Sequence, residues 1–370
     1  MTPRRVLLAI GMLLAMWGVA RADGPTPFTT ILRAHWKEWG GASGSITPDQ
    51  LDRLMKRRSI QGDDGAALAA MKLNEKDPNT KQPITWTLKR IEDYEALVAE
   101  HRKQNNYDKS YAKARAAIKA DPHTLYVAGA PHLSSIRQAR NGDCWLLSTI
   151  GAMIHRNRHE LRGLISDEDD HLYAVHFAFQ TFTVKAPTDA EIGTFTSDKD
   201  DGDWLYILEN AVGQYRERYD RLHHVAEAND GALVGGNGAL AIRGVLGHNS
   251  DAVRMTPQKP QHDLVRKTLT RAFKERRLVI LSTTHDETIT LPKGIARGHA
   301  MAVIGWDAAA DTVTIWNPWG NTLEPKGTGP NDGYKTVNGV FTMPLVDFTR
   351  SFACMDVEND KLYKPAKPKK

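Results

Sequence analysis

A predicted β-hairpin in the C-terminal third constrains the fold of this chain most strongly. Residues 300–306 and 312–316 are apolar, β-branched runs typical of strands, and the polar residues 307–311 between them predict a turn. The turn lies midway between His299 and Asn317, so the hairpin places these side chains about 5 Å apart, within one register step. Asn317 can then accept a hydrogen bond from one ring nitrogen of His299 and leave the other nitrogen for a second partner. Taken alone, His299 is better explained as a structural histidine in a strand.

Cys144 stands where a helix is predicted to begin. Gly142 and Asp143 interrupt the chain before it, and an apolar face of helical period follows, formed by Trp145, Leu146, Ile150, Met153 and Ile154. The dipole and free N–H groups of a helix N-terminus favour a thiolate, the nucleophilic form of cysteine. The alternative is a buried structural cysteine, because a free cysteine packs as a small hydrophobe.

Taken together, Cys144, His299 and Asn317 form a more specific pattern than any of them alone. A thiol, a base and a group that orients the base make an activated nucleophile, and this chain order is that of papain-like thiol peptidases. Gln138, six residues before Cys144, can place its side-chain amide beside the Cys144 backbone N–H. Two such donors would form an oxyanion hole, where losing one donor typically costs about 10²–10³ in rate.

The segments around these residues, 138–147, 298–300 and 317–320, resemble the calpain family of cysteine peptidases. The resemblance extends over about residues 128–357, and the further matching segments are 204–211, 235–236 and 339–352. Together with the export signal described below, it suggests a secreted, bacterial calpain-like catalytic domain.

This resemblance implies an α+β fold with a papain-like core of two subdomains. Cys144 and Gln138 would lie on a helical subdomain. His299 and Asn317 would lie on a β-rich subdomain, so that catalysis would depend on how the two subdomains meet.

The resemblance also implies how a substrate is held. Trp319 would shield the hydrogen bond between the catalytic histidine and asparagine from water. The backbones of Gly236 and Gly298 would pair with an extended peptide substrate, because glycine lets two backbones approach closely.

The region before the catalytic segment is predicted to be helical. Residues 28–39, 66–73, 87–101 and 107–120 have helical periodicity, and Thr47, Pro48 and Gln50 predict a capped helix start. Residues 39–50 have the outline of an EF-hand loop but lack carboxylates at the first, third and fifth ligand positions, which argues against calcium binding there. This domain could dock on the core, act as a propeptide, or be a passive surface domain.

The first residues are typical of an export signal. Arg4 and Arg5 precede an apolar stretch of 15 residues, 6–20, and Ala20-Arg21-Ala22 fits a cleavage site. The stretch is shorter than the roughly 20 residues that span a membrane. We therefore expect an exported protein, periplasmic or extracellular, without stable membrane insertion after signal cleavage. An uncleaved N-terminal anchor is the alternative.

These patterns divide the chain into four parts. The predicted division is a signal peptide (1–22), a degenerate EF-hand-like helical domain (23–122), a catalytic domain (123–360, with subdomains of about 123–255 and 256–360) and a basic disordered tail (361–370). Within the catalytic domain, helices are predicted over 204–219 and 265–273, a strand pair over 173–184 and a buried strand over 278–282.

Charge and cysteine content narrow the range of partners. The net charge of +5 falls to +2 once three arginines leave with the signal peptide, too little to indicate nucleic-acid binding.

The only two cysteines are Cys144 and Cys354. A disulfide between them must be considered in an exporting compartment, although we expect Cys354 to be part of the core. We expect a monomer that acts on a protein or peptide substrate.

No cofactor is expected for the chemistry, and calcium is left open as a regulator. Calpains control the meeting of their subdomains with calcium held by acidic loops. The acidic position that the family has three residues before the oxyanion glutamine is Ser135 here, which puts calcium control in doubt. The carboxylate-rich segments 167–170 and 198–203 could bind calcium instead, or be solvated loops.

The resulting prediction is a cysteine endopeptidase that acts through Cys144, His299 and Asn317, with Gln138 at the oxyanion hole. Two other functions stay open. One is a calpain-fold binding protein without catalysis, against which the intact residue set argues. The other is an acyl-transferring, transglutaminase-like enzyme, although such enzymes usually have aspartate where Asn317 stands.

Overall fold

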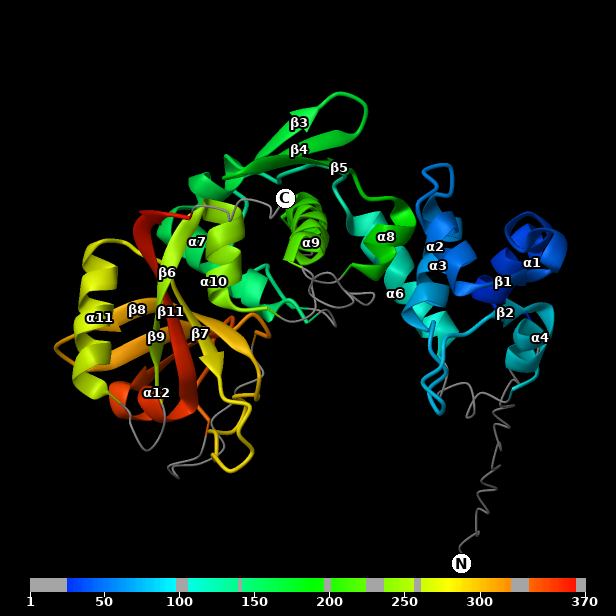
Figure 1. Cartoon of the computed structure of the whole chain (residues 1–370). Coiled ribbons are helices and arrows are strands. Elements are labelled where there is room, and N and C mark those ends of the chain that lie inside the picture. The colour runs from blue at the N-terminus through cyan, green and yellow to red at the C-terminus, as the bar shows by residue number, and fades with distance from the viewer. Residues whose placement is uncertain are drawn as a thin grey trace, which may run out of the picture.

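The chain combines helices with antiparallel sheets, which fits the predicted α+β class. The computed structural model describes residues 25–97, 106–138, 142–195, 201–223, 236–255, 261–320 and 333–363. The predicted signal peptide and most of the predicted tail lie outside these residues. Figure 1 shows the N-terminal helices gathered at one end of the molecule and the larger sheet at the other. No described helix has the length and apolar content needed to cross a membrane.

Three of the described N-terminal helices begin at threonine caps, Thr26, Thr47 and Thr87, and the cap at Thr47 is the one that the sequence predicted. The N-terminal helices are α1 (Pro27–Trp39), α2 (Pro48–Met55), α3 (Gly62–Leu73), α4 (Leu88–Ala96) and α6 (Tyr107–Ala120), with a short 3-10 turn, η1 (Gly41–Ser43), after α1. Thr47 and Gln50 form the predicted capping box: the Gln50 N–H donates to Thr47 Oγ1 at 3.3 Å, and the Thr47 N–H donates to Gln50 Oε1 at 2.9 Å. The helix predicted over 87–101 is too long: α4 ends at Ala96, because Leu97 adopts an extended backbone conformation.

The loops of two helix–loop–helix units pair with each other in this N-terminal region. β1 (Ser45–Ile46), between α1 and α2, is antiparallel to β2 (Trp86–Thr87), which precedes α4. In the second loop, Asp77 accepts backbone N–H groups from Asn79 and Thr80 at 2.9 and 3.0 Å. Protein donors therefore hold this loop, and neither loop offers the ring of carboxylates that an EF-hand cation needs.

A short helix from the catalytic part of the chain completes the core of these N-terminal helices. α8 (Asp189–Thr194) packs on α3 and α6, and Ala190 and Ile192 are buried with their apolar residues. The Thr188 hydroxyl donates to the Met55 carbonyl at 2.5 Å, and the Gly62 N–H donates to the Asp189 carboxylate at 2.6 Å. The helical region is thus joined to the rest of the molecule by packing as well as by the chain (Figure 1).

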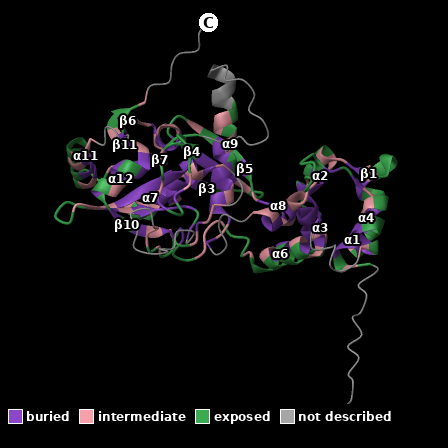
Figure 2. Cartoon of the chain, turned by 90° about the horizontal axis from the view of Figure 1, so that it is seen from below, coloured by how far each residue is buried: buried purple, intermediate pink, exposed green. Residues whose placement is uncertain are grey.

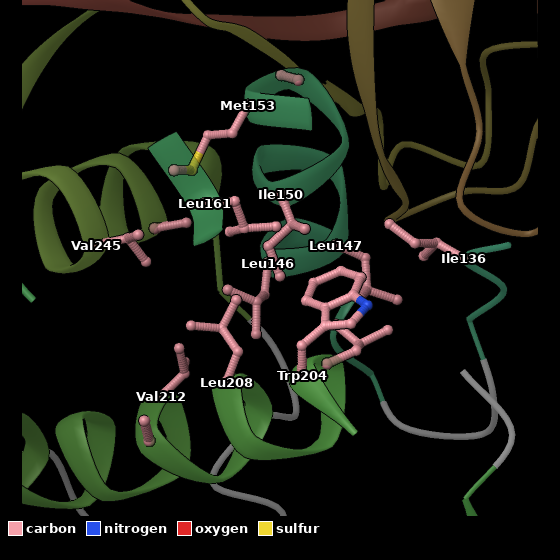
Figure 3. Close-up of a cluster of buried hydrophobic side chains, with 14 of the residues drawn as sticks. Ile136, Leu146, Leu147, Ile150, Met153, Leu161, Trp204, Leu208, Val212 and Val245 are labelled. Carbon is pink, nitrogen blue, oxygen red and sulfur yellow. The ribbon is translucent and has the colours of Figure 1, made fainter. Parts of the chain in front are cut away.

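Two long helices form the centre of the catalytic part. α7 (Cys144–Arg162) and α9 (Trp204–His223) bury Leu146, Trp204 and Leu208 together (Figure 3). The remaining elements here are β3 (Ile165–Glu168), β4 (Leu172–Phe177), β5 (Gln180–Lys185), α10 (Gly238–Ala241) and a π-helical turn, η2 (Ile242–Leu246). β3, β4 and β5 form an antiparallel sheet against which α9 packs, and its β4–β5 hairpin confirms the strand pair predicted over 173–184.

A six-stranded antiparallel sheet carries the predicted hairpin. Its order is β10 (Val340–Pro344), β9 (Thr312–Trp316), β8 (Ala300–Asp307), β7 (Val279–Thr283), β11 (Phe352–Leu362) and β6 (His248–Arg254). β6 belongs to this sheet although it precedes residue 256, where the second subdomain was predicted to begin. The helices α11 (His262–Lys274) and α12 (Leu345–Ser351) confirm the helices predicted near 265–273 and in the segment 339–352.

Both faces of the central strands β7 and β8 are buried, because residues of opposite parity along them belong to different cores. In β8, Met301 and Val303 pack with α11 and α12, whereas Ala300 and Ala302 face α7 and its apolar residues. Figure 2 shows one region of buried residues around α7 and the sheets, and a separate one among the N-terminal helices. The strand that begins directly after His299, β8, is therefore packed on one face against the helix that begins at Cys144.

The register of the hairpin differs from the predicted one by two residues. Ala302 pairs with Trp316 and Val303 with Ile315, so the same register sets Asn317 opposite Met301 and not opposite His299. The difference arises at the turn, where Asp307 pairs with Thr312. A bulge between Val303 and Gly305 then brings the pairing one residue closer to the predicted register.

Candidate active site

His299 and Asn317 are neighbours, as the hairpin predicted. His299 comes directly before β8 and Asn317 directly after β9, and the imidazole Nε2 lies 2.8 Å from Asn317 Oδ1. Both residues are almost fully buried, with 2% and 0% of their surface exposed. With Nε2 donating to Asn317, Nδ1 is left as the nitrogen that can exchange a proton with another group.

Trp319 covers this pair. Its ring centroid lies 4.0 Å from that of His299, and its backbone N–H donates to Asn317 Oδ1 at 3.0 Å. Asn317 Oδ1 therefore accepts two hydrogen bonds, which fixes the orientation of the amide. Trp319 itself is 38% exposed, so one edge of its ring faces solvent while the ring lies against the imidazole.

Cys144 lies at the N-terminus of α7, where its sequence predicted it. The backbone N–H of Ala300, the residue after His299, is within hydrogen-bonding reach of the thiol. Cys144 is half-buried and free. The fold thus places the thiol beside the backbone of the residue that follows His299, although Cys144 and His299 are separated by more than 150 residues in the sequence.

Burial holds both groups neutral in the substrate-free protein. It raises the pKa of the Cys144 thiol, against the lowering by the backbone N–H groups of Ala300, Trp145 and Cys144 itself. Burial also lowers the pKa of His299 to about 4, and the hydrogen bond to Asn317 offsets only part of that effect. The helix N-terminus was expected to favour a thiolate, but here desolvation is the larger influence.

Gln138 is held on both sides by the segment that follows Asn317. Its backbone N–H donates to the Pro318 carbonyl at 2.8 Å, and its side-chain Oε1 accepts from Trp319 Nε1 at 2.6 Å. Because Oε1 is engaged by an indole N–H, the amide is oriented with Nε2 as its donor end. Gln138, Trp319 and Asn317 thus form one connected set around the imidazole.

A comparison with protein families decides where this site belongs. The model of the calpain family cysteine protease domain matches residues 91–332, which is well over half of the chain. The chain belongs to the calpain family of cysteine proteases. The matched residues include Cys144, His299 and Asn317.

Curated relatives of this calpain-family chain are distant and much longer. Calpain-8 of Rattus norvegicus is 22% identical over 272 residues, which is 64% of this chain and 37% of the relative. The calpain-type cysteine protease DEK1 of Zea mays is 26% identical over 256 residues, 61% of this chain and 11% of the relative. The calpain-2 catalytic subunit of Mus musculus is 24% identical over 280 residues, 65% and 37% respectively. The alignment therefore covers little more than a third of these proteins at most.

The two glycines expected to bind substrate lie beside the site of this calpain-family chain. Gly298 has a φ of +61°, and a Cβ there would approach the ring of His285 to 2.5 Å, so only glycine fits. A Cβ on Gly236 would meet the indole of Trp145 at 2.5 Å. Gly236 is thus held against the residue next to Cys144, while Gly298 directly precedes His299.

Two residues at the site escaped prediction from the sequence. The Thr283 hydroxyl accepts the His299 backbone N–H at 2.9 Å and donates to the Ala296 carbonyl at 2.7 Å, which fixes the start of β8. Asp143 is fully buried beside Cys144 and faces the side chains of Glu209 and Gln138 without completing a well-aligned hydrogen bond, and burial raises its pKa to about 6. Strand alternation indicates that Thr283 points inward but does not identify its partners.

The described carboxylates that were considered for calcium do not gather into a metal site, and one of them, Asp201, accepts hydrogen bonds from the protein itself. Among the described residues, no group of three or more His, Cys, Asp or Glu side chains could hold a metal ion. Asp201 is buried and accepts hydrogen bonds from Ser135 Oγ and from the ring and backbone of His132. The position that is acidic in the family thus donates to a carboxylate here. Residues 198–200 lie outside the described part.

The remaining candidates contribute no chemistry that the geometry identifies. Cys354 lies on β11, half-buried and free, so no disulfide joins it to Cys144. His285 packs against Gly298 at the cleft, which gives this histidine a steric role. Gly235, which belongs to the matching segment 235–236, lies outside the described residues.

Proposed function

We propose that this protein is a calpain-like cysteine endopeptidase that hydrolyses peptide bonds through a thioester. The observation that carries the proposal is the buried His299–Asn317 hydrogen bond beside a free thiol at a helix N-terminus. Because the curated relatives extend far beyond the aligned region, their activities are evidence for the domain and not for the whole protein.

In this mechanism, Cys144 Sγ attacks the carbonyl carbon of the scissile bond while His299 Nδ1 takes the thiol proton. The negative charge that develops on the carbonyl oxygen is stabilised by the Gln138 side-chain amide and the Cys144 backbone N–H. Cleavage of the C–N bond releases the amine, which leaves with the proton from His299. Water then attacks the thioester carbonyl carbon and gives a proton to His299. The C–S bond breaks to release the carboxylic acid, and the thiolate takes the proton back from His299. Asn317 holds the imidazole in orientation throughout.

The fold supports a papain-like arrangement of two subdomains. One would contain α7 and α9. The other would contain the six-stranded sheet, in which His299 directly precedes β8 and Asn317 directly follows β9. The cleft would run along the junction, between Gly236 on one side and Gly298 on the other. No cofactor takes part in this chemistry. Export to the periplasm or medium, bacterial origin and the monomeric state stay predictions.

We further propose that calcium is not needed to assemble the site. Asp201 joins the segment before Gln138 to the start of α9 through His132 and Ser135, so protein donors do what a bound cation would do. The protein is therefore expected to cleave a quenched-fluorescence casein equally in EGTA and in millimolar calcium, under reducing conditions. Cleavage only with calcium would contradict the calcium proposal while supporting the peptidase.

The same assay separates the other two functions. Absence of cleavage in both conditions would favour a binding protein without catalysis. If an added amine becomes joined to the substrate acyl group instead of free carboxyl ends appearing, the enzyme is an acyltransferase. New N-termini, without amine incorporation, are the result that the endopeptidase proposal requires.

We propose that the N-terminal helical domain is a docked structural part and not a propeptide. A Cβ on Gly193 of α8 would lie 2.7 Å from the Ala69 Cβ and 3.1 Å from the Ala114 Cβ. Gly193→Leu is expected to destabilise the protein by about 2 kcal/mol or more through overpacking. The change should lower the unfolding temperature without raising peptidase activity.

Gly163→Leu is the matched control, because Gly163 is exposed at the end of α7 and its Cβ position is 3.5 Å from the nearest atoms. Thermal unfolding and casein cleavage are measured on the same preparations. Increased activity of Gly193→Leu would show that the helical domain inhibits the enzyme, as a propeptide does.

A further inference from the structure

A buried carboxylate joins the Cys144 helix to the sheet at a distance from the active site. Glu358 of β11 is only 3% exposed. Its Oε2 accepts from Arg156 Nη1 at 2.6 Å and from the Leu278 N–H at 2.9 Å, and its Oε1 lies 2.6 Å from His248 Nδ1. One carboxylate thereby contacts α7, β6 and the residue before β7.

Arg156 is the only partner of Glu358 in this set that comes from α7. It lies twelve residues after Cys144 on the same helix, which is about 18 Å along the axis at 1.5 Å per residue. Arg156 Nη1 also donates to the Arg276 carbonyl at 3.3 Å, and Arg276 Nη2 donates to the Arg156 carbonyl at 2.9 Å. Asn157 has non-helical φ and ψ, so the regular part of α7 ends at this contact.

Apolar packing holds α7 closely on the sheet, and a Cβ on Gly151 of α7 would lie 2.3 Å from the Trp316 indole. The hydrophobic effect itself is non-directional. Charge-assisted hydrogen bonds are directional, and a buried ion pair that loses one member leaves a desolvated charge. The Glu358 contacts therefore oppose sliding of α7, and sliding would move Cys144 relative to His299.

We propose that Glu358 and Arg156 form a positioning clamp that sets the alignment of Cys144 with His299. This inference rests on the proposed peptidase function and deepens it. Neither residue touches the substrate, because both act at the other end of α7. A misplacement of about 1 Å between reacting groups can cost on the order of 10²-fold in rate.

The chain offers a matched control for this clamp. Arg156 Nη2 and Nε also bind Glu160 Oε2, at 2.6 and 3.1 Å, one turn further along the same helix. Glu160→Gln removes an ion pair with the same arginine but leaves the link between α7 and the sheet. Glu358→Gln removes the buried negative charge that pairs with Arg156 and keeps the size of the side chain.

The test compares kcat, KM and the rate of Cys144 alkylation by iodoacetamide in the full chain, well below each variant's unfolding temperature. We expect Glu358→Gln to lower kcat and the alkylation rate tenfold or more while KM changes less than twofold. Glu160→Gln should leave all three within twofold. A merely structural role would lower only the unfolding temperature, and unchanged kcat and alkylation in folded Glu358→Gln would overturn the clamp.

Two further measurements keep the outcome decisive. If Glu358→Gln does not fold, Arg156→Lys is tested instead. Lysine keeps the positive charge but lacks the planar guanidinium that reaches both Glu160 and Glu358. The expected changes in kcat, KM and alkylation rate are the same as for Glu358→Gln. Iodoacetamide alkylation needs no peptide substrate. A wild-type protein without peptidase activity but with an alkylation rate that depends on Glu358 would contradict the proposed function and support the clamp.

Discussion

Cys144→Ala is expected to lower kcat/KM for peptide cleavage by at least about 10⁴-fold, because removing the nucleophile leaves only binding and oxyanion stabilisation. The fold should survive, since the half-buried thiol makes few contacts that an alanine methyl cannot replace. Cleavage of quenched casein and thermal unfolding are measured side by side.

Cys354→Ala is the matched control for this substitution. Cys354 is also half-buried and free, but it lies within β11, and burial raises the pKa of its thiol to about 11. Its activity should stay within about twofold of wild type, as substitutions away from a site usually do. Full activity of Cys144→Ala would exclude thiol catalysis by this residue.

His299→Ala is the second substitution with a large expected effect, about 10³-fold or more in kcat. Burial raises the pKa of the Cys144 thiol, so without a base beside it the thiol is not deprotonated at neutral pH. Reaction of Cys144 with iodoacetamide should slow in parallel. A variant with near wild-type kcat would show that another group accepts the thiol proton.

The stability of the protein should also depend on His299. Its pKa is about 4 in the folded state and about 6.5 when unfolded, so the unfolded chain binds the extra proton between these values. Stability is therefore full above pH 6.5 and falls by about 3 kcal/mol as the pH drops through 4.

His299→Gln isolates this contribution by urea unfolding at several pH values. Asp143 has the opposite effect on the pH dependence of stability, since burial raises its pKa to about 6. Its contribution is present in both wild type and His299→Gln, so it cancels in the difference between them. The difference between wild type and His299→Gln should therefore shrink toward low pH. A difference that does not change with pH would show that His299 is not buried as a neutral base.

Much of the fold could be predicted because its signals are local. The helix over Tyr107–Ala120 has the predicted bounds, and the strand over Thr312–Trp316 does as well. The capping box at Thr47 fixed the start of α2 in advance. Short-range periodicity and caps are read within a few residues, so they do not depend on how the rest of the chain packs.

What could not be predicted depends on long-range packing. α8 belongs to the N-terminal core although its sequence lies among catalytic elements, and β1 pairs with β2 across forty residues. Glu358 has no local feature that marks it as a partner of Arg156. The pKa of Cys144 likewise reflects how deeply the assembled fold buries the thiol, which a helix N-terminus alone does not reveal.

The active-site residues could be predicted from the sequence because they lie where helices and strands begin or end. Cys144 begins a helix, and His299 and Asn317 flank a hairpin, so predicted elements located them. Thr283 and Asp143 were missed for the opposite reason: each acts through neighbours that are distant in the sequence.

The most direct test of the central claim is labelling with an irreversible, thiol-directed peptide inhibitor, followed by mass spectrometry of the digested protein. The account predicts one label per chain, on Cys144, with none on Cys354 and slow labelling in His299→Ala. Equal labelling of both cysteines, or none on Cys144 in folded protein, would contradict an activated nucleophile at this site.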